Sequence, residues 1–263
     1  MAADRTDDLR RIRQALERAA SILARFTPSR VGVSYKGQGS PVTEADLAVD
    51  EALRRELPRP GEGWLSEETP DDASRLERRR VWIVDPLDGT REFLAGVPEW
   101  CISIGLAEDG RAVAGGVYNP TADELVLGSL ETGATLNGRT VRVSTRATLD
   151  GALVLVTRWA LTRQRGLAYH GAPFTPRAVG PVAYALALIA AGRADAMWSR
   201  SSKPEWDIAA GAALIAAAGG HVAAWDGRPL RFNQWPPQAS GIVAAGGRLA
   251  PAARAFITAA TGS

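Results

Sequence analysis

The chain has 263 residues, 46% of them hydrophobic, and its 31 Lys and Arg against 29 Asp and Glu give a net charge of +2. A chain of this length can bury an extensive core without disulfides or metal staples. Both signs of charge are interspersed, with no basic stripe or acidic tail, so stable nucleic-acid binding is not expected. Cys101 is the single cysteine, which excludes an intrachain disulfide and favours a reducing compartment.

The N-terminal segment does not resemble an export signal. Residues 1–8 carry charges where a secretory signal has its apolar run. The longest apolar stretch, at 208–219, is shorter than the roughly 18 residues that a membrane span needs. We therefore expect a cytoplasmic protein with no membrane partner.

Two helices are expected near the N-terminus. Apolar residues recur at helical spacing between positions 6 and 25, which predicts an amphipathic helix that ends before Pro28. A second helix should begin at Thr43, because a hydroxyl followed three residues later by the carboxylate of Asp46 is a capping pattern. Pro58 and Pro60 should end this second helix.

From residue 81 the pattern changes to short strands. Runs at 81–84, 101–106, 113–118 and 124–127 are separated by turn pairs, which predicts an antiparallel meander. In the second half we expect strands at 152–156, 194–198, 221–225 and 241–245, and helices at 182–191, 207–218 and 251–258. The fold class is therefore α/β in the mixed α+β sense, with two layered subdomains, 1–145 and 146–263, as the simplest division.

The sharpest local feature is the apolar strand at 81–84 that runs straight into Asp85 and Asp88. The turn can present both carboxylates and the carbonyl of Leu87 to a hard cation. Glycine at position 89 allows close backbone approach, so the amides of Gly89 and Thr90 can face an anion. Oxygen donors without nearby Cys or His favour magnesium over zinc. By itself the segment is equally compatible with an ordinary Asp-rich turn.

Two further acidic clusters occur along the chain. Glu67 and Glu68 follow a short apolar pair, and Asp207 lies in the opening turn of a predicted helix, where the helix dipole suits an anion. Taken singly, these clusters are also compatible with a solvated acidic loop and an ordinary helix cap.

The run DPLDGT at 85–90, SEE at 66–68 and WDIAAG at 206–211 together resemble the inositol monophosphatase superfamily of magnesium-dependent, lithium-sensitive phosphatases. The resemblance extends from Lys36 to Pro229 and covers most of the chain. It implies a layered αβαβα sandwich of the sugar-phosphatase type, a centre of two or three Mg²⁺ ions, and a homodimer.

The resemblance also implies a role for each matching residue. The metal ligands it implies are four carboxylates and one carbonyl, from Glu67, Asp85, Asp88, Asp207 and Leu87. The catalytic residues it implies are Asp46, Glu67 and Thr90, with Asp46 and Thr90 orienting the attacking water. The substrate-binding residues it implies are Lys36, Gly89, Thr90, Arg200 and Lys203. Most metal ligands thus fall in the first subdomain, with Asp207 in the second.

The resemblance implies a phosphomonoesterase that hydrolyses a small phosphorylated metabolite with metal-activated water. Ser66 and the REF run at 91–93 look more like the 3'(2'),5'-bisphosphate nucleotidase branch, which acts on 3'-phosphoadenosine 5'-phosphate. Arg200 and Lys203 would then seat the second phosphate. The alternatives are an inositol-1-monophosphatase, a histidinol-phosphate phosphatase, and a non-catalytic regulatory or RNA-associated scaffold. Because Asp46 and Thr90 are retained beside the ligand set, the enzyme ranks ahead of the scaffold.

Overall fold

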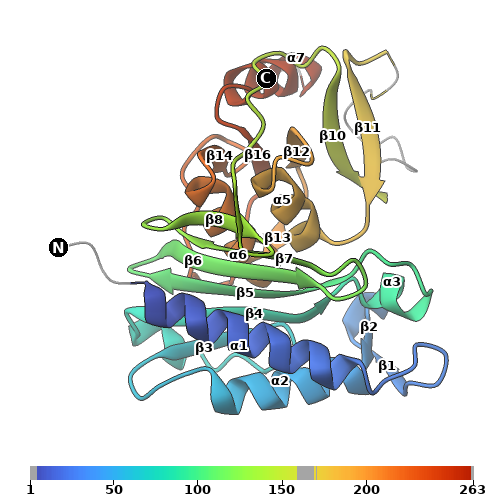
Figure 1. Ribbon diagram of the computed structural model, residues 1–263, viewed down its shortest axis with the longest axis vertical. Helices are drawn as coiled ribbons and strands as arrows, with labels where there is room; N and C mark the ends of the chain where they lie inside the picture. The colour runs from blue at the N-terminus through green and yellow to red at the C-terminus, as the bar shows by residue number, and fades with distance from the viewer. Residues whose placement is uncertain (1–4, 159–168, 170, 262–263) are drawn as a thin grey trace.

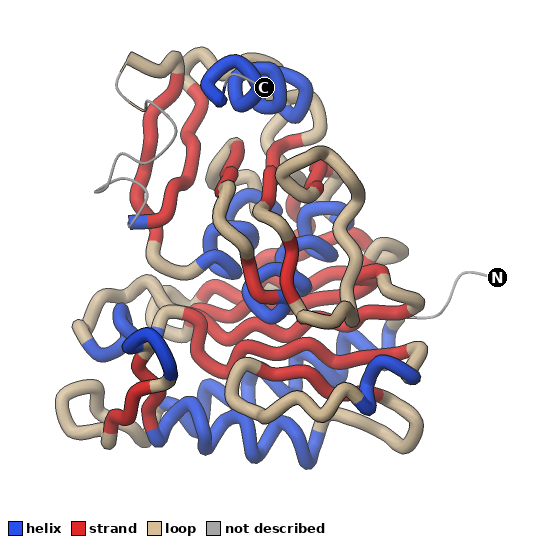
Figure 2. The backbone as a smooth tube through the Cα atoms, turned by 180° about the vertical axis from the view of Figure 1, so that it is seen from behind, coloured by secondary structure: helices blue, strands red, loops and turns tan. Residues whose placement is uncertain are grey.

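The protein is a sandwich of five layers, as a computed structural model that describes residues 5–158, 169 and 171–261 shows. The layers alternate between helices and sheets in the order αβαβα (Figure 1). Seen from behind, helices again lie on both faces of the large sheet (Figure 2). The layered αβαβα sandwich expected from the sequence is confirmed.

The first layer consists of α1 (Thr6–Leu23) and α2 (Glu44–Glu56). Between them lies a hairpin of β1 (Val33–Tyr35) and β2 (Pro41–Thr43), joined through the 3-10 turn η1 (Gly37–Gly39). Thr43 caps α2 as predicted: its hydroxyl accepts the amides of Ala45 and Asp46, and the Asp46 carboxylate accepts the Thr43 amide. Local capping chemistry thus places Asp46 in the first turn of α2.

The second layer is a seven-stranded sheet whose strand order follows the sequence. Its strands are β3 (Gly63–Ser66), β4 (Arg80–Asp88), β5 (Cys101–Glu108), β6 (Arg111–Asn119), β7 (Glu124–Ser129), β8 (Gly133–Leu136) and β9 (Arg139–Val141). From β4 onward the strands form the predicted antiparallel meander, whereas β3 runs parallel to β4 at one edge. The 3-10 turn η2 (Ser74–Glu77) precedes β4, and the short helix α3 (Thr90–Leu94) follows it.

Strand β4 divides its side chains between two hydrophobic cores. Trp82 and Val84 face the core under α1 and α2, whereas Val81 and Ile83 face the core on the opposite side of the sheet. This is the two-residue alternation of a strand buried on both faces. The strand is therefore held firmly up to its carboxyl end, where Asp85 and Asp88 lie.

The third layer consists of α5 (Val182–Ala190) and α6 (Glu205–Ala217), packed between the two sheets. Helix α6 lies in backbone contact with the large sheet. A Cβ atom at Gly105 would come within 2.8 Å of the Ala210 nitrogen, and one at Gly115 within 2.8 Å of the Ala210 Cα. Glycine at these strand positions therefore allows α6 to approach the sheet closely.

The fourth and fifth layers are a five-stranded sheet and α7 (Ala250–Thr261). The sheet contains β10 (Ala152–Thr157), β11 (Phe174–Val179), β12 (Ala196–Ser199), β14 (Gly220–Ala223) and β16 (Ile242–Gly246) in the order β11-β10-β12-β16-β14. A separate short pair joins β13 (Lys203–Pro204) to β15 (Gln238–Ala239). The strands and helices predicted for the second half are all present, with boundaries shifted by at most three residues.

The edge strand β11 was missed by the sequence analysis. Only its two terminal residues are buried, and Pro176 interrupts its middle. Such a strand carries no continuous apolar run, and an edge position is where proline is tolerated. The division of the chain near residue 145 stays a prediction, because α5 and α6 from the second half pack on the sheet of the first. Among the described helices, none is long and apolar enough to cross a membrane.

A partly buried ionic cluster around Glu62 ties α1 to the edge of the large sheet. The Glu62 carboxylate accepts hydrogen bonds from Arg11 Nη2 (2.6 Å), Trp82 Nε1 (2.8 Å) and the Arg59 amide (2.9 Å), and Arg80 Nε lies 3.1 Å away. Burial opposes ionisation, but these bonds outweigh it and lower the pKa of Glu62 to about 2.

Replacing Glu62 by Gln should therefore destabilise the protein near neutral pH by about 2–3 kcal/mol, because Arg11 and Arg80 lose their shared anion. The folded pKa of about 2 lies below the ordinary value of 4.5, so this contribution is present above the ordinary pKa and is lost as pH falls toward 2. Urea denaturation should show the gap between wild type and Glu62→Gln shrinking over that window. A gap independent of pH would contradict the assignment.

Candidate active site and metal centre

A cleft of about 320 Å³ opens at the carboxyl end of β4, beside α3 and the first turn of α6. Seven of the residues singled out from the sequence line it: Glu67, Asp85, Leu87, Asp88, Gly89, Thr90 and Asp207. They come from three segments that are far apart in the chain, the loop after β3, the end of β4, and α6. The fold therefore brings together the carboxylates that the sequence presented as separate clusters.

The turn at the end of β4 depends on an irregular strand and a glycine. The pairing of β4 with β5 shifts register between Asp85 and Asp88, and Asp85 Oδ1 accepts the Leu87 amide at 3.0 Å. Gly89 has a φ of 99°, and a Cβ there would lie 2.8 Å from Pro181 Cγ. Only glycine fits this left-handed, crowded position. The bulge aims Asp85 and Asp88 into one cleft.

Helix α5 holds one oxygen of Asp88. Asp88 Oδ2 accepts the amide of Ala183, in the first turn of α5, at 2.8 Å. Each of the two β4 acids thus has one oxygen held by a main-chain amide. Among the described residues, no hydrogen bond occupies Asp85 Oδ2 or Asp88 Oδ1. These oxygens suit a hard cation.

The acids in the cleft perturb one another strongly. Burial raises the pKa of Asp88 to about 7, and burial with the negative charges of Glu67 and Asp88 raises the pKa values of Asp85 and Asp207 well above their ordinary range. Asp88 and Asp207 are partly exposed to the cleft, yet burial by the surrounding protein is still the largest contribution to their raised pKa values. The ionised cluster is therefore unfavourable unless positive charge is supplied.

The donor set fits Mg²⁺. It consists of carboxylates and a main-chain carbonyl, and no Cys or His lines the cleft. Within the described part of the chain, no group of three or more His, Cys, Asp or Glu side chains lies close enough together to hold a metal ion as placed. The converging charges and their raised pKa values are what favour a cation here. Glu67, Asp85, Asp88 and Asp207, with the Leu87 carbonyl, are the residues that would hold it.

Lys203 lies close to this cluster, whereas Arg200 does not. Lys203 is 9% exposed and donates a hydrogen bond to Ser201 Oγ at 2.8 Å. Its positive charge offsets part of the rise in the pKa values of Asp88 and Asp207. Its own pKa is lowered by burial. Arg200 is exposed, and neither cation is among the described residues that line the cleft. Their contacts with substrate stay predictions.

Lys36 is engaged by the acidic loop. Its ammonium lies 3.1 Å from Glu67 Oε1 and 2.7 Å from Glu68 Oε2. Burial lowers the pKa of Lys36, but the two carboxylates outweigh that effect and raise it. Burial also raises the pKa of Glu68 to about 7. Lys36 thus offsets the charge of this loop, and its expected contact with substrate stays a prediction.

Thr90 and Asp46 form the hydroxyl–carboxylate pair expected for orienting water. Thr90 Oγ1 lies 3.1 Å from Asp46 Oδ1 and 3.2 Å from the Leu87 carbonyl oxygen. Asp46 is buried, and its other oxygen accepts the amide of Thr43. The Thr90 hydroxyl can donate its single proton to only one of these acceptors. Its oxygen therefore keeps a lone pair that can accept a hydrogen bond from a water in the cleft. The geometry suits removal of a proton from that water.

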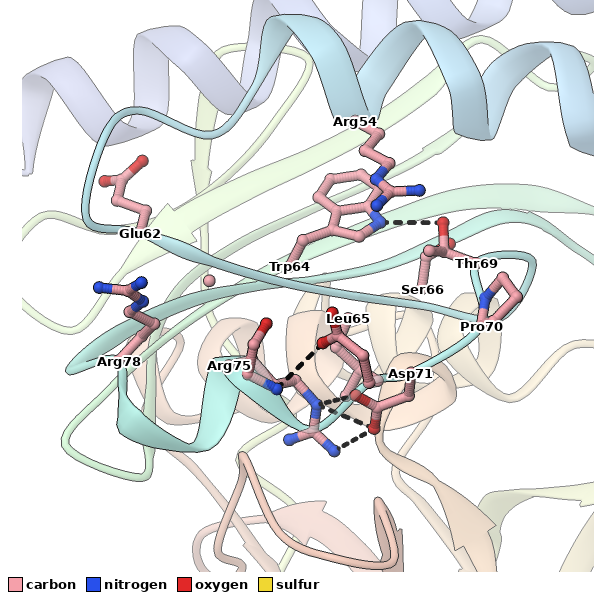
Figure 3. A pocket seen from close by; sticks show the side chains of 13 residues that line it. Arg54, Glu62, Trp64, Leu65, Ser66, Thr69, Pro70, Asp71, Arg75 and Arg78 are labelled. Carbon is pink, nitrogen blue, oxygen red and sulfur yellow. Dashed lines mark hydrogen bonds and ion pairs between the residues drawn. The ribbon is translucent and has the colours of Figure 1, made fainter.

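The sequence analysis missed Asp50, which supports the loop of the site. It lies one helical turn after Asp46 and is buried. Its carboxylate accepts the hydroxyls of Ser66 and Thr69, and Trp64 Nε1 donates to Thr69 Oγ1 at 3.1 Å (Figure 3). These bonds fasten the loop that carries Glu67 to α2. A carboxylate at a core-facing helix position was the signal that could have identified it.

Comparisons with known proteins relate nearly the whole chain to one family. The model of the inositol monophosphatase family matches residues 6–260. An inositol-1-monophosphatase of Rhizobium meliloti is 35% identical over 93% of this chain and 93% of its own. The Nus factor SuhB of Xylella fastidiosa is 32% identical over 86% of this chain and 84% of its own.

Solved structures show the same fold. The extragenic suppressor protein SuhB of Bartonella henselae superposes with a TM-score of 0.82 at 30% identity, covering 96% of this chain and 98% of its own. An inositol monophosphatase from Anabaena gives a TM-score of 0.78 at 27% identity, covering 98% of both chains.

Replacing Asp85 by Asn should abolish the stabilisation that Mg²⁺ gives, because it removes charge from the most deeply buried acid of the set. Saturating Mg²⁺ should stabilise the wild-type protein and so raise its melting temperature. At a Mg²⁺ concentration of 100 times Kd, the gain in stability should be about 2.7 kcal/mol. Without metal the variant should be at least as stable as wild type, because one like charge is gone. Glu99→Gln is the control, since Glu99 pairs with Arg177 outside the cleft lining. An equal Mg²⁺ response in Asp85→Asn would exclude Asp85 from the centre.

Proposed function

The chain belongs to the inositol monophosphatase family and is a phosphomonoesterase, and we propose that it uses Mg²⁺ to hydrolyse inositol 1-phosphate or a related small polyol monophosphate. The observation that carries the proposal is the convergence of Glu67, Asp85, Asp88 and Asp207 on one cleft that also holds Thr90. The names of relatives that align with most of the chain support the same substrate class.

The residues of the cleft divide the work of phosphate-ester hydrolysis. Bound magnesium ions would neutralise the phosphate charge and activate water, which requires the carboxylates to hold them in fixed positions. Asp46 and Thr90 orient the water for in-line attack. Gly89 allows the left-handed turn at the cleft wall, where a Cβ would meet Pro181, and Lys203 adds positive potential near Asp207. Catalysis on this basis is positioning and charge neutralisation, with no covalent intermediate.

The exposure of Arg200 favours a polyol monophosphate over a bisphosphate nucleotide. Arg200, expected to seat a second phosphate, is exposed and is not part of the described cleft lining. Glu92 also lines this cleft, and its carboxylate lies 3.4 Å from Arg158 Nε. The bisphosphate nucleotide remains the second candidate, because Arg91 lines the cleft and the buried Lys203 lies near Asp88 and Asp207.

A phosphate-release panel tests the assignment directly. Inositol 1-phosphate, histidinol phosphate, fructose 1,6-bisphosphate and 3'-phosphoadenosine 5'-phosphate should be compared with and without Mg²⁺. We expect the highest kcat/KM for inositol 1-phosphate and no turnover without Mg²⁺. Preference for the adenosine bisphosphate would restore the nucleotidase assignment.

A scaffold function is the alternative from another class. A relative that aligns with most of the chain is named Nus factor SuhB. The complete carboxylate set and the Thr90–Asp46 pair favour the enzyme, since a scaffold does not need them. Absence of turnover on every substrate of the panel would favour the scaffold. The homodimer and the cytoplasmic location implied at the sequence level stay predictions.

Replacing Thr90 by Ala should lower kcat by about 100-fold or more, because the water loses the hydroxyl that links it to Asp46. Thr90→Ser, which keeps the hydroxyl, should retain most of the activity. Calorimetric Mg²⁺ binding should be similar in both variants, since the threonine hydroxyl is not among the proposed ligands. Equal activity of the two variants would rule out a role for the hydroxyl.

A further inference from the structure

We propose that Arg75 is a positioning residue for the metal centre, because it joins the loop of Glu67 to the first turn of the helix that carries Asp207. The connection, which we name the Arg75 clamp, consists of Asp71, Arg75, Glu205, Asn233 and Gln234. The proposal rests on the metal-dependent function proposed above, and it concerns residues outside the described cleft lining.

The clamp matters because the ligands come from different layers of the fold. Glu67 follows β3 at the edge of the large sheet, whereas Asp207 lies in the first turn of α6 in the middle layer. The hydrogen bonds and ion pairs of the described residues include none between these two side chains. Their separation therefore depends on what holds the two segments together.

The first half of the clamp fixes the loop. Arg75 is 1% exposed, and its Nε lies 3.1 Å from both oxygens of Asp71, while Nη2 lies 2.6 Å from Oδ2. Figure 3 shows the guanidinium directed at this carboxylate. Both side chains line a second pocket, which is also lined by residues of β3. Gly63 leaves room, since a Cβ there would lie 3.0 Å from Arg75 Cβ. Asp71 is four residues after Glu67, so the bond restrains the same loop that Asp50 holds from α2.

The second half of the clamp fixes the start of α6. Arg75 Nη1 donates to Asn233 Oδ1 at 2.6 Å, and Nη2 donates to the Gln234 carbonyl at 2.9 Å. The amides of Asn233 and Gln234 in turn donate to Glu205 at 2.7 and 2.8 Å. Glu205 is 1% exposed, is the first residue of α6, and precedes Asp207 by two positions.

The chemistry of the clamp suits alignment. Burying a guanidinium and a carboxylate is costly, and well-packed apolar groups often give equal or greater stability. A planar guanidinium, however, fixes direction as well as distance, because its donors form a rigid fork. Metal binding is sensitive to such supports, since loss of residues behind the ligands typically costs about 10–100-fold in affinity. The clamp therefore sets the spacing between Glu67 and Asp207.

Arg75→Lys tests the role, because lysine keeps the charge and loses the fork. We expect calorimetry on the full chain to show Mg²⁺ affinity reduced about tenfold. Half-saturation of activity by Mg²⁺ should shift by the same factor, whereas kcat at saturating Mg²⁺ should change by no more than roughly threefold.

Asn233→Gly is the second variant, in case the first does not fold. Asn233 has a φ of 61°, which glycine tolerates, and the substitution keeps the amide that binds Glu205 while removing the side chain that binds Arg75. It should weaken Mg²⁺ binding in the same direction. Arg11→Lys is the matched control, because Arg11 is a buried arginine in the Glu62 cluster, outside the cleft lining. It should lower the melting temperature and leave Mg²⁺ affinity unchanged.

Wild-type Mg²⁺ affinity in folded Arg75→Lys and Asn233→Gly would overturn the clamp and leave the proposed function intact. Equal loss of Mg²⁺ affinity in Arg11→Lys would also overturn it, since general loosening would then explain the effect. A wild-type chain that neither binds Mg²⁺ nor releases phosphate would refute the proposed function itself, and the clamp with it.

Discussion

Repulsion among buried carboxylates is the constraint on which the rest of this structure depends. Asp85, Asp88 and Asp207 meet in a cleft where burial and their mutual charge disfavour ionisation. A fold can hold such a cluster only if other interactions compensate for it and if a cation can be admitted. Main-chain amides on Asp85 and Asp88 and the ammonium of Lys203 supply part of that compensation.

The five-layer fold supplies the rigidity that the cluster requires. Strand β4 is anchored by hydrophobic cores on both faces, and α6 lies in backbone contact with the sheet because Gly105 and Gly115 leave room for it. The loop of Glu67 is the least regular part of the site, and polar side chains hold it. Asp50 fastens it from α2 and Arg75 fastens it from the other side. Irregular segments that carry ligands thus rely on buried hydrogen bonds where helices and strands rely on packing.

Family membership and substrate choice have different physical bases in this protein. The carboxylates and the Thr90–Asp46 pair are the residues proposed to act on the phosphate, which all phosphomonoester substrates share. On the proposed function, the alcohol part of the substrate would be recognised by other residues of the cleft lining, which includes Arg91 and Glu92. The cation chosen from sequence spacing to recognise a second phosphate, Arg200, is exposed outside that lining. Sequence distance to Asp207 did not show which side chains line the cleft.

The sequence by itself determined whatever depends on neighbouring residues: the capped start of α2 at Thr43, the meander, and the acidic turn after β4. Only the tertiary structure decided that Glu67 and Asp207 share a cleft, that β3 and β11 complete the sheets, and that Arg75 meets Asn233. The physical reason is range. Caps, turns and periodicity are set within a few residues, whereas long-range contacts depend on how whole layers pack, which no local pattern encodes.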